Sequence, residues 1–211
     1  MPFSKISGVY VYDLTLQQLV LRLLAIFSIV SLHGYALSVC AIALGDPTPR
    51  IDGRLSLSPL VQVDLFGLLA GIVYQLGWSR NIKINRSNLK FGQWGLILCW
   101  LTPLLLVFLF GWTLQFLNPF MQIYLDPASG QDVQMFLTET GRLSIWFTLL
   151  NLFPLPPLAG AILWSETKWG RISNRYSFIL GAMMILLIAS GIFIKIFMPT
   201  YLMITSLLNI H

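Results

Sequence analysis

The sequence predicts an α-helical integral membrane protein. Of its 211 residues, 56% are hydrophobic and only 10% are charged, whereas a soluble domain carries roughly a quarter charged residues. The mean hydropathy is +0.77, and the apolar residues gather in long runs between short polar loops. So few charges could not cover a surface exposed to water. We therefore expect one membrane domain, occupying residues 1–211, with about four to five membrane segments.

The apolar runs give the expected membrane segments. A helix needs about 20 apolar residues to cross a bilayer. Runs of sufficient length lie at 16–44, 94–117, 134–153 and 176–197. The run at 64–77 is shorter, and the sequence leaves open whether it crosses. The tail beyond 197 is apolar enough to lie on the membrane surface, so we assign a last span and a surface helix to 176–211.

The segment after the first helix combines helix-breaking residues with a β-like pattern. Gly, Pro and Asp in "GDPTPR", 45–50, are expected to end the helix. The stretch "RLSLSPL", 54–60, alternates apolar and small polar residues, which is typical of a short strand. Asp64 is a good N-cap residue, and we expect it to cap a helix that begins at residue 65.

Basic residues in two loops set the expected orientation in the membrane. The loop 78–91 contains four basic residues and no acid, and the connector 165–175 contains three basic residues. The positive-inside rule places both on the cytoplasmic side of a bacterial inner membrane or a thylakoid-type membrane. The net charge of +5 is then a topology signal, and we expect no nucleic-acid partner.

Three stretches, in order, resemble the site-2 protease family of intramembrane zinc metalloproteases. "LHGYALSVCAIALGDPTPR" at 32–50 is similar to the family's helical H-E-x-x-H followed by G-D-P-T. "GRLSLSPLVQVDLFG" at 53–67 is similar to its G-R-L-T-L-N-P-L segment, and "NLFPLPPLAGA" at 151–161 to its N-L-x-P-x-P-P-L-D-G. The resemblance implies a site-2-protease-like core over about 32–161.

The same resemblance assigns roles to four positions. In the family, two histidines at i and i+4 on one helix face and an aspartate from another helix bind zinc, and the glutamate beside the first histidine is the general base. His33 matches the first histidine. Gly34 stands at the glutamate, Leu37 at the second histidine and Ala159 at the aspartate. The resemblance therefore implies a degenerate member that binds no zinc and is not an enzyme, a pseudoprotease.

A scaffold that recognises membrane segments could still hold them. We expect the chain to bind another integral membrane protein, as an accessory subunit or as an assembly or regulatory factor of a membrane complex. The expected cleft residues are His33, Asn151, Pro154 and Pro157. Lipids are further expected partners, and a pigment or lipid could bind near His33. There are simpler interpretations for two of these residues. His33 would be hydrogen-bonded to a neighbour such as Ser31. Asn151 would hydrogen-bond to backbone groups that lose their helical partners because of the prolines.

Three other functions stay open at this point. An active metalloprotease with a non-standard metal site would need ligands outside the family positions, and the candidates are His211, Asp46, Asp52 and Asp64. A lipid- or pigment-binding membrane subunit is compatible with the expected fold. A transporter or channel would normally show ionisable residues within several spans, and the expected spans carry few.

Overall fold

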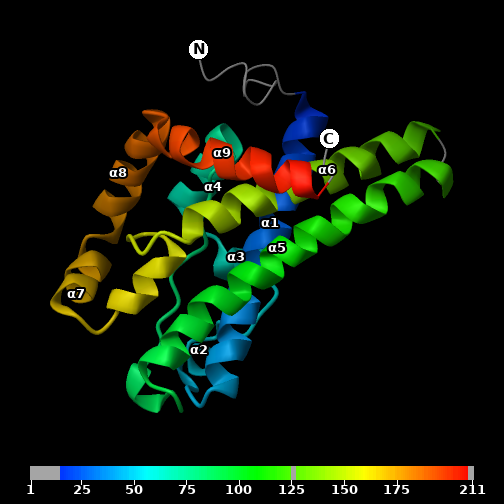
Figure 1. The fold of residues 1–211 in the computed structure, drawn as a ribbon. Helices are drawn as coiled ribbons and strands as arrows, with labels where there is room; N and C mark the ends of the chain where they lie inside the picture. Colours follow the sequence, from blue (N-terminus) through cyan, green and yellow to red (C-terminus); the bar gives the residue numbers. More distant parts are fainter. Residues whose placement is uncertain (1–14, 125–126, 209–211) are drawn as a thin grey trace.

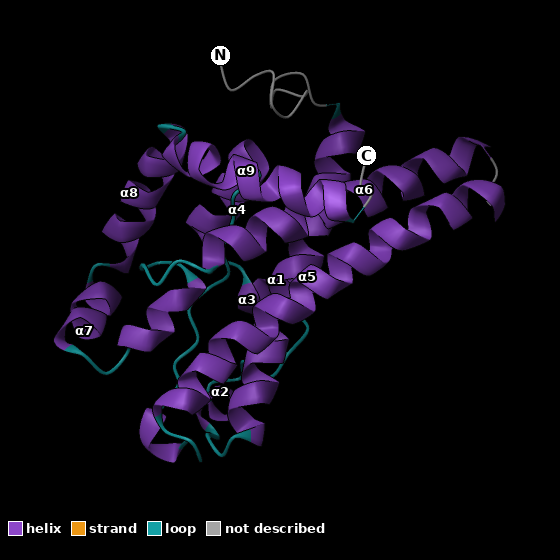
Figure 2. Cartoon of the chain, viewed as in Figure 1, coloured by secondary structure: helices purple, strands orange, loops and turns teal. Residues whose placement is uncertain are grey.

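The structure, a computed structural model, describes residues 15–124 and 127–208. These residues are mostly helical, as Figure 2 shows. In chain order the elements are α1 (Leu16–Ala43), α2 (Thr48–Ile51), α3 (Pro59–Gln62), α4 (Leu65–Tyr74), η3 (Arg86–Asn88), α5 (Gln93–Tyr124), α6 (Pro127–Asn151), η4 (Ala159–Trp164), α7 (Lys168–Arg175), α8 (Ser177–Ala189) and α9 (Ile192–Leu207).

The long helices α1, α5 and α6 form the frame of the molecule (Figure 1). A capping box starts α1, because the Oγ1 of Thr15 accepts a hydrogen bond from the Gln18 N–H while the Thr15 N–H donates to the Gln18 side chain. Apolar side chains fill the space between the three helices: Ala25, Ile26, Ile29, Val30, Leu104, Val107, Leu143 and Phe147. Burial of this surface holds the frame together.

Glycine allows α5 and α6 to approach closely. A Cβ atom placed on Gly111 would lie 2.4 Å from the Cβ of Ser144, and one placed on Gly141 would lie 2.3 Å from the Cγ of Gln115. Neither position has room for a side chain, so the two helices lie side by side as an antiparallel pair (Figure 1).

The structure contains fewer membrane-spanning candidates than the sequence predicted. By length and composition, α1 and the Gln93–Met121 part of α5 can cross a membrane. The pair α8 and α9 adds a third if its two helices, which meet at a 65° bend, count as one broken span. α6 is not among these candidates; the predicted span at 134–153 contains Glu139, Arg142 and several uncharged polar residues. The short run at 64–77 becomes α4, with only 10 helical residues.

The predicted strand at 54–60 was wrong. Among residues 15–124 and 127–208 no strand forms, and the one β-like contact is an isolated antiparallel bridge between Val63 and Ser79. Pro59 instead begins the helical turn α3, a position that suits the fixed φ of proline. The predicted cap of the next helix is confirmed, because Asp64 Oδ1 accepts a hydrogen bond of 2.9 Å from the Gly67 N–H.

A buried ionic cluster connects α1, α4 and α6. Arg22 Nε donates to Glu139 Oε1 at 2.6 Å, and Arg22 Nη1 donates to the Ile72 carbonyl at 3.0 Å. Arg142 is the second partner of Glu139. Arg22 is therefore buried in the protein, where its charge has a partner.

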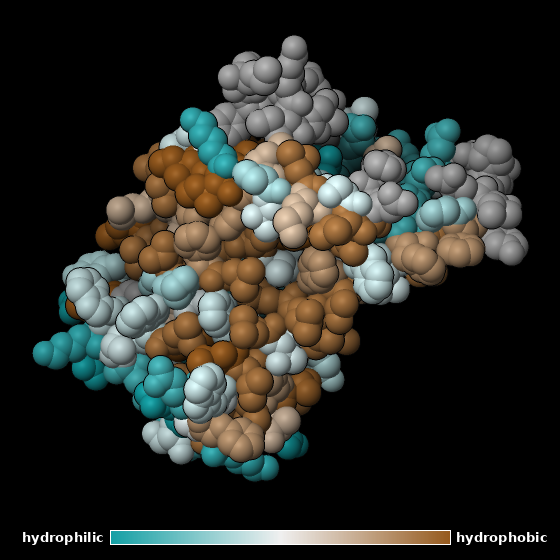
Figure 3. All heavy atoms as spheres, in the orientation of Figure 1, coloured by the Kyte–Doolittle hydropathy of each residue, from teal (hydrophilic) through white to brown (hydrophobic). Residues whose placement is uncertain are grey.

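The outer surface is largely apolar. Figure 3 shows hydrophobic side chains over most of the visible face, with hydrophilic ones at its edges. Large exposed apolar side chains lie on α5 and α8, among them Leu105, Phe116 and Leu186. A surface of this kind suits contact with lipid, which fits the membrane assignment made from composition.

Candidate functional site

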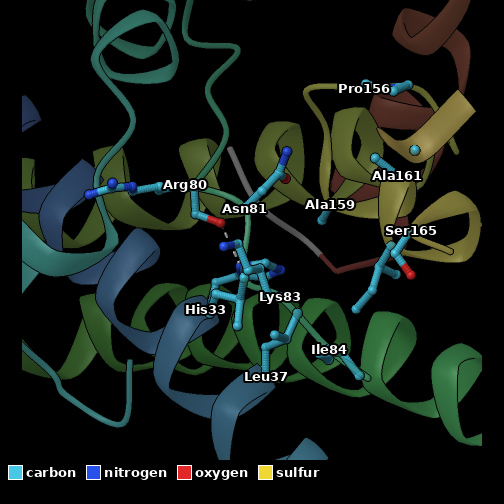
Figure 4. Close-up of a pocket in the computed structure, with 14 residues that line it drawn as sticks. His33, Leu37, Arg80, Asn81, Lys83, Ile84, Pro156, Ala159, Ala161 and Ser165 are labelled. Atoms are coloured by element: carbon cyan, nitrogen blue, oxygen red, sulfur yellow. Dashed lines mark hydrogen bonds between the residues drawn. The ribbon is translucent and has the colours of Figure 1, made fainter. Parts of the chain in front are cut away.

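The candidate site is a cavity of about 310 Å³. It lies between α1, the extended segment 79–84 and the region from 156 to 170 that contains η4. Figure 4 shows His33, Lys83 and Leu37 on one side of it and Ala159 and Ser165 on the other. Its lining residues are His33, Leu37, Ser79, Arg80, Asn81, Ile82, Lys83, Ile84, Pro156, Ala159, Ala161, Ile162, Ser165 and Gly170.

His33 lines this cavity, and one of its ring nitrogens has no hydrogen-bond partner among the described residues. Its Nδ1 atom is hydrogen-bonded to the Oγ of Ser79 at 2.8 Å, and its ring meets Phe147 edge-on with centroids 5.2 Å apart. The expected neighbour Ser31 is not the partner. Nε2 is buried and has no hydrogen-bond partner among the described residues. A buried polar atom without a partner costs free energy, so this atom is suited to meet a polar group of a bound molecule.

The structure brings together three of the four positions that the family resemblance singled out. His33 and Leu37 lie one helical turn apart on α1, and Ala159 reaches the same cavity from the start of η4. The fourth position, Gly34, faces α3 instead. A Cβ atom on Gly34 would lie 2.2 Å from the Oε1 of Gln62, so the Gln62 amide occupies the space that a side chain at position 34 would need.

Gln62 is a site residue that the sequence reasoning missed. It is fully buried, and its Nε2 donates to the carbonyls of Arg54 at 2.8 Å and Ser56 at 2.9 Å. Its own backbone carbonyl accepts from the Arg80 N–H at 2.8 Å. The side chain thus ties the loop 54–58 to α3, beside Gly34 of α1. The residue stands inside the second family-like stretch, but nothing in its spacing indicated contact with Gly34.

The extended segment 79–84 forms one wall of the cavity and is held at both ends. At its start, the Arg54 guanidinium donates to the carbonyls of Val61 and Arg80. Burial of that guanidinium, together with the nearby charge of Arg80, lowers the pKa of Arg54 from its ordinary value. Between its ends, residues 82–84 make no backbone–backbone hydrogen bond within the described residues. Their N–H and C=O groups are available beside the cavity.

The "GDPT" stretch anchors the far end of this segment. Asp46 is buried and accepts hydrogen bonds from the Thr48 N–H at 3.1 Å, the Thr48 hydroxyl at 2.6 Å, the Asn85 N–H at 2.7 Å and the Asn88 amide at 3.0 Å. Burial opposes ionisation of the carboxyl group, but these hydrogen bonds outweigh it and lower the pKa of Asp46. The stretch therefore ends the first helix and also holds residues 85–88 in place through Asp46.

Asn151 holds the proline-rich stretch in place through hydrogen bonds to the backbone. Its Nδ2 donates to the carbonyls of Gly77 at 3.1 Å and Phe147 at 2.8 Å, and its Oδ1 accepts from the Ala159 N–H at 3.1 Å. It therefore ties down backbone around the prolines. Of the four predicted cleft residues, His33 lines the cavity, whereas Asn151, Pro154 and Pro157 do not. The proline that does is Pro156.

The described residues around His33 do not fit a zinc ion held by three protein ligands. A zinc site needs nitrogen, sulfur or carboxylate donors, and Leu37 and Ala159 offer only carbon. No group of three His, Cys, Asp or Glu side chains within residues 15–124 and 127–208 is arranged to hold a metal. Among the alternative ligands, Asp46 and Asp64 are engaged as described above and Asp52 is exposed. His211 lies outside the described residues.

The comparisons with known proteins identify a relative. No family model and no solved structure matches the chain. A Bacillus subtilis (strain 168) protein named "Putative zinc metalloprotease YwhC" is 31% identical over 162 residues, which cover 71% of this chain and 68% of that protein. The chain belongs to the family of YwhC. This relationship supports the resemblance to site-2 proteases that the three sequence stretches indicated.

The name of this relative corrects one prediction. The loss of the general base and of two metal ligands at three family positions predicted that the chain is not an enzyme, and a family member named as a zinc metalloprotease contradicts this. The prediction rested on the residues at those three positions. Substitutions there do not exclude an activity that uses groups from other positions.

Proposed function

We propose that the chain is a membrane protein of a metalloprotease-like family whose cavity binds a segment of another integral membrane protein. In this role it acts as an accessory subunit or as an assembly or regulatory factor of a membrane complex. One observation carries the proposal most directly. The unpaired backbone of residues 82–84 lies beside a cavity with mostly apolar walls.

The unpaired backbone favours an extended ligand. A helical segment satisfies its own N–H and C=O groups, so it would leave those of Ile82, Lys83 and Ile84 unpaired. An extended segment can add alongside them as a strand and exchange backbone hydrogen bonds. Apolar side chains of that segment would then lie against Leu37, Ile162 and Pro156, which line the cavity.

The orphan nitrogen of His33 adds a polar contact to this mode of binding. Nε2 is buried and unpaired within the described residues, and the hydrogen bond between the Ser79 hydroxyl and the other ring nitrogen fixes the orientation of the ring. A backbone or hydroxyl group of the bound segment would give Nε2 its missing partner. A hydrogen bond of this kind contributes about 1 kcal/mol and, more importantly, fixes the register of the bound segment.

A second candidate function is cleavage of the bound segment. The observation in its favour is the name of the relative. Both candidates need the segment to enter the same cavity, so one experiment can address them together.

Photocrosslinking in the native membrane tests the proposal. A photoreactive amino acid would replace Lys83, which lines the cavity, and in a control chain it would replace Leu186, which is exposed on α8. We expect a defined integral membrane protein to be crosslinked from position 83 and not from position 186. Equal products from the two positions, or lipid alone at position 83, would contradict binding of a protein segment.

The same sample separates the two candidate functions. The crosslinked protein is sized by mass spectrometry, and the zinc content of the purified chain is measured. A full-length crosslinked partner supports a holding role. A partner that accumulates in a shortened form only when this chain is present supports cleavage instead.

A further inference from the structure

Helix α7 exposes a basic face that the proposed function does not use. The helix begins at Thr167, whose hydroxyl accepts a hydrogen bond of 3.2 Å from the Gly170 N–H. Its exposed basic residues are Lys168, Arg171 and Arg175, and the helix contains no acidic residue. Within eight residues, three positive charges therefore face away from the protein.

Apolar side chains lie on the same outer side of α7. Trp169 is 74% exposed, and Ile172 is exposed as well. The inner side is formed by Gly170, where an added Cβ would lie 2.1 Å from the Trp164 carbonyl oxygen. One side of the helix therefore packs against the protein, and its outer side carries both basic and apolar side chains. A large exposed tryptophan beside several cations is typical of a helix that lies in the membrane interface.

The basic side chains of α7 have no acidic partner within the described part of the chain. Neither of the two ion pairs found there involves Lys168, Arg171 or Arg175. The neighbouring acid, Glu166, accepts a hydrogen bond of 2.9 Å from the Arg86 N–H. The guanidinium of Arg175 lies 5.9 Å from the ring centre of Tyr176, a contact that leaves its charge uncompensated.

The position of α7 in the fold indicates what covers this face. Tyr176 alone separates α7 from α8, and the first turn of α8 contains the exposed residues Phe178, which is 71% exposed, and Ile179. Figure 1 shows α7 at the end of α8. By length and composition, α8 and α9 together can form one broken span, and α7 directly precedes the start of α8.

We propose that α7 is a binding surface for anionic phospholipid headgroups. Lys168, Arg171 and Arg175 contact the phosphates, and Trp169 and Ile172 enter the boundary between headgroups and acyl chains. The combination of cations with an exposed tryptophan, next to a lipid-facing helix, favours a lipid surface over an acidic protein.

Hydrogen–deuterium exchange of the intact chain tests this surface. The chain is placed in nanodiscs of phosphatidylcholine alone or of phosphatidylcholine mixed with phosphatidylglycerol, and exchange of the amides of 168–175 is followed by mass spectrometry. We expect slower exchange in the anionic nanodiscs and loss of this difference at high salt, which screens exposed charges. Neutralisation in the double variant Lys168→Gln/Arg171→Gln should reduce the difference by about fivefold for each side chain.

A second double variant serves as the control. Arg86→Gln/Lys90→Gln removes the same charge from the neighbouring basic loop, and it should leave the lipid dependence of α7 unchanged. Equal exchange in the two lipids, or equal loss in both variants, would overturn the proposal. Slowing produced by added polyglutamate but not by phosphatidylglycerol would overturn it in favour of an acidic protein partner.

Discussion

Gly34 shows how a single position can be filled from a distant part of the chain. The space beside its Cα atom contains the amide of Gln62, whose Nε2 is bound to two carbonyls of the loop 54–58. The four family-like positions could be singled out from sequence, because motif order and spacing are local properties. The contact between Gly34 and Gln62 could not, because it depends on how α3 folds back against α1.

A methyl group at position 34 should therefore destabilise the protein. In Gly34→Ala, the new Cβ needs space that the Gln62 side chain occupies, and overpacking of this kind costs about 1–3 kcal/mol. Thermal unfolding of the purified chain in detergent measures the loss. Ser28→Ala, on the same helix, should have a much smaller effect. Equal stabilities of Gly34→Ala and the original chain would show that Gln62 moves aside freely.

Asp46 should make stability depend on pH. Because its pKa is lowered in the folded state, its contribution is present above the pKa of the unfolded state, about 4, and is lost as the pH falls through the lower folded value. The two carboxylate oxygens of Asp46 accept four hydrogen bonds. Asp46→Asn replaces one of these oxygens by an amide NH2 group, which cannot accept, and should cost about 1–3 kcal/mol at neutral pH.

Unfolding measured across the acid range checks this expectation. Asp46→Asn should lose less stability on acidification than the original chain, and Asp52→Asn, which alters an exposed carboxylate, should behave like the original chain. An acid dependence that is unchanged in Asp46→Asn would refute the role given to this carboxylate.

At the scale of elements, charge and proline account for the differences between expectation and structure. The run 134–153 looked like a span by its apolar content, but its helix α6 carries Glu139 and Arg142, which join a buried cluster with Arg22. The alternation in 54–60 looked like a strand, but Pro59 starts a helical turn. The ion pairs of α6 are tertiary contacts, which a local pattern does not reveal. The effect of Pro59 is local, and the alternating pattern hid it.

The cluster of α1, α4 and α6 gives a testable stability effect. Glu139→Gln leaves the buried Arg22 guanidinium without its counter-charge, and breaking a buried pair in this way costs about 3–5 kcal/mol. Arg142→Gln should cost less, because Glu139 keeps Arg22 as a partner and Arg142 is more exposed. Comparison of the two variants by thermal unfolding tests the order, and a larger loss in Arg142→Gln would reverse it.

The extended wall of the cavity gives a prediction about binding. Lys83→Pro removes one backbone N–H from the unpaired edge, whereas Lys83→Gln removes only the charge. We expect the partner protein to co-purify with Lys83→Gln but to be recovered about fivefold less with Lys83→Pro, since a lost hydrogen bond costs about 1 kcal/mol. Equal recovery with both variants would argue against strand pairing at this edge.

The whole molecule is a helical frame that places one cavity beside an unpaired stretch of backbone. The composition was sufficient to predict a helical membrane protein. The family resemblance of the three stretches was sufficient to single out His33, Leu37 and Ala159, which line one cavity in the structure. The number of membrane-crossing candidates was not predictable from apolar runs alone. The bend between α8 and α9, at Gly191 with φ of +78°, and the pairing of Glu139 on α6 with Arg22 on α1 become apparent only in the folded chain.

Hydrogen–deuterium exchange of residues 79–84, compared between the isolated chain and its complex with the crosslinked partner, tests the central claim most directly. The account predicts fast exchange of the amides of 82–84 in the isolated chain, where they have no backbone partner, and slow exchange in the complex. Exchange of these amides that is equally fast in both samples, while the partner stays bound, would contradict binding of an extended segment at this cavity.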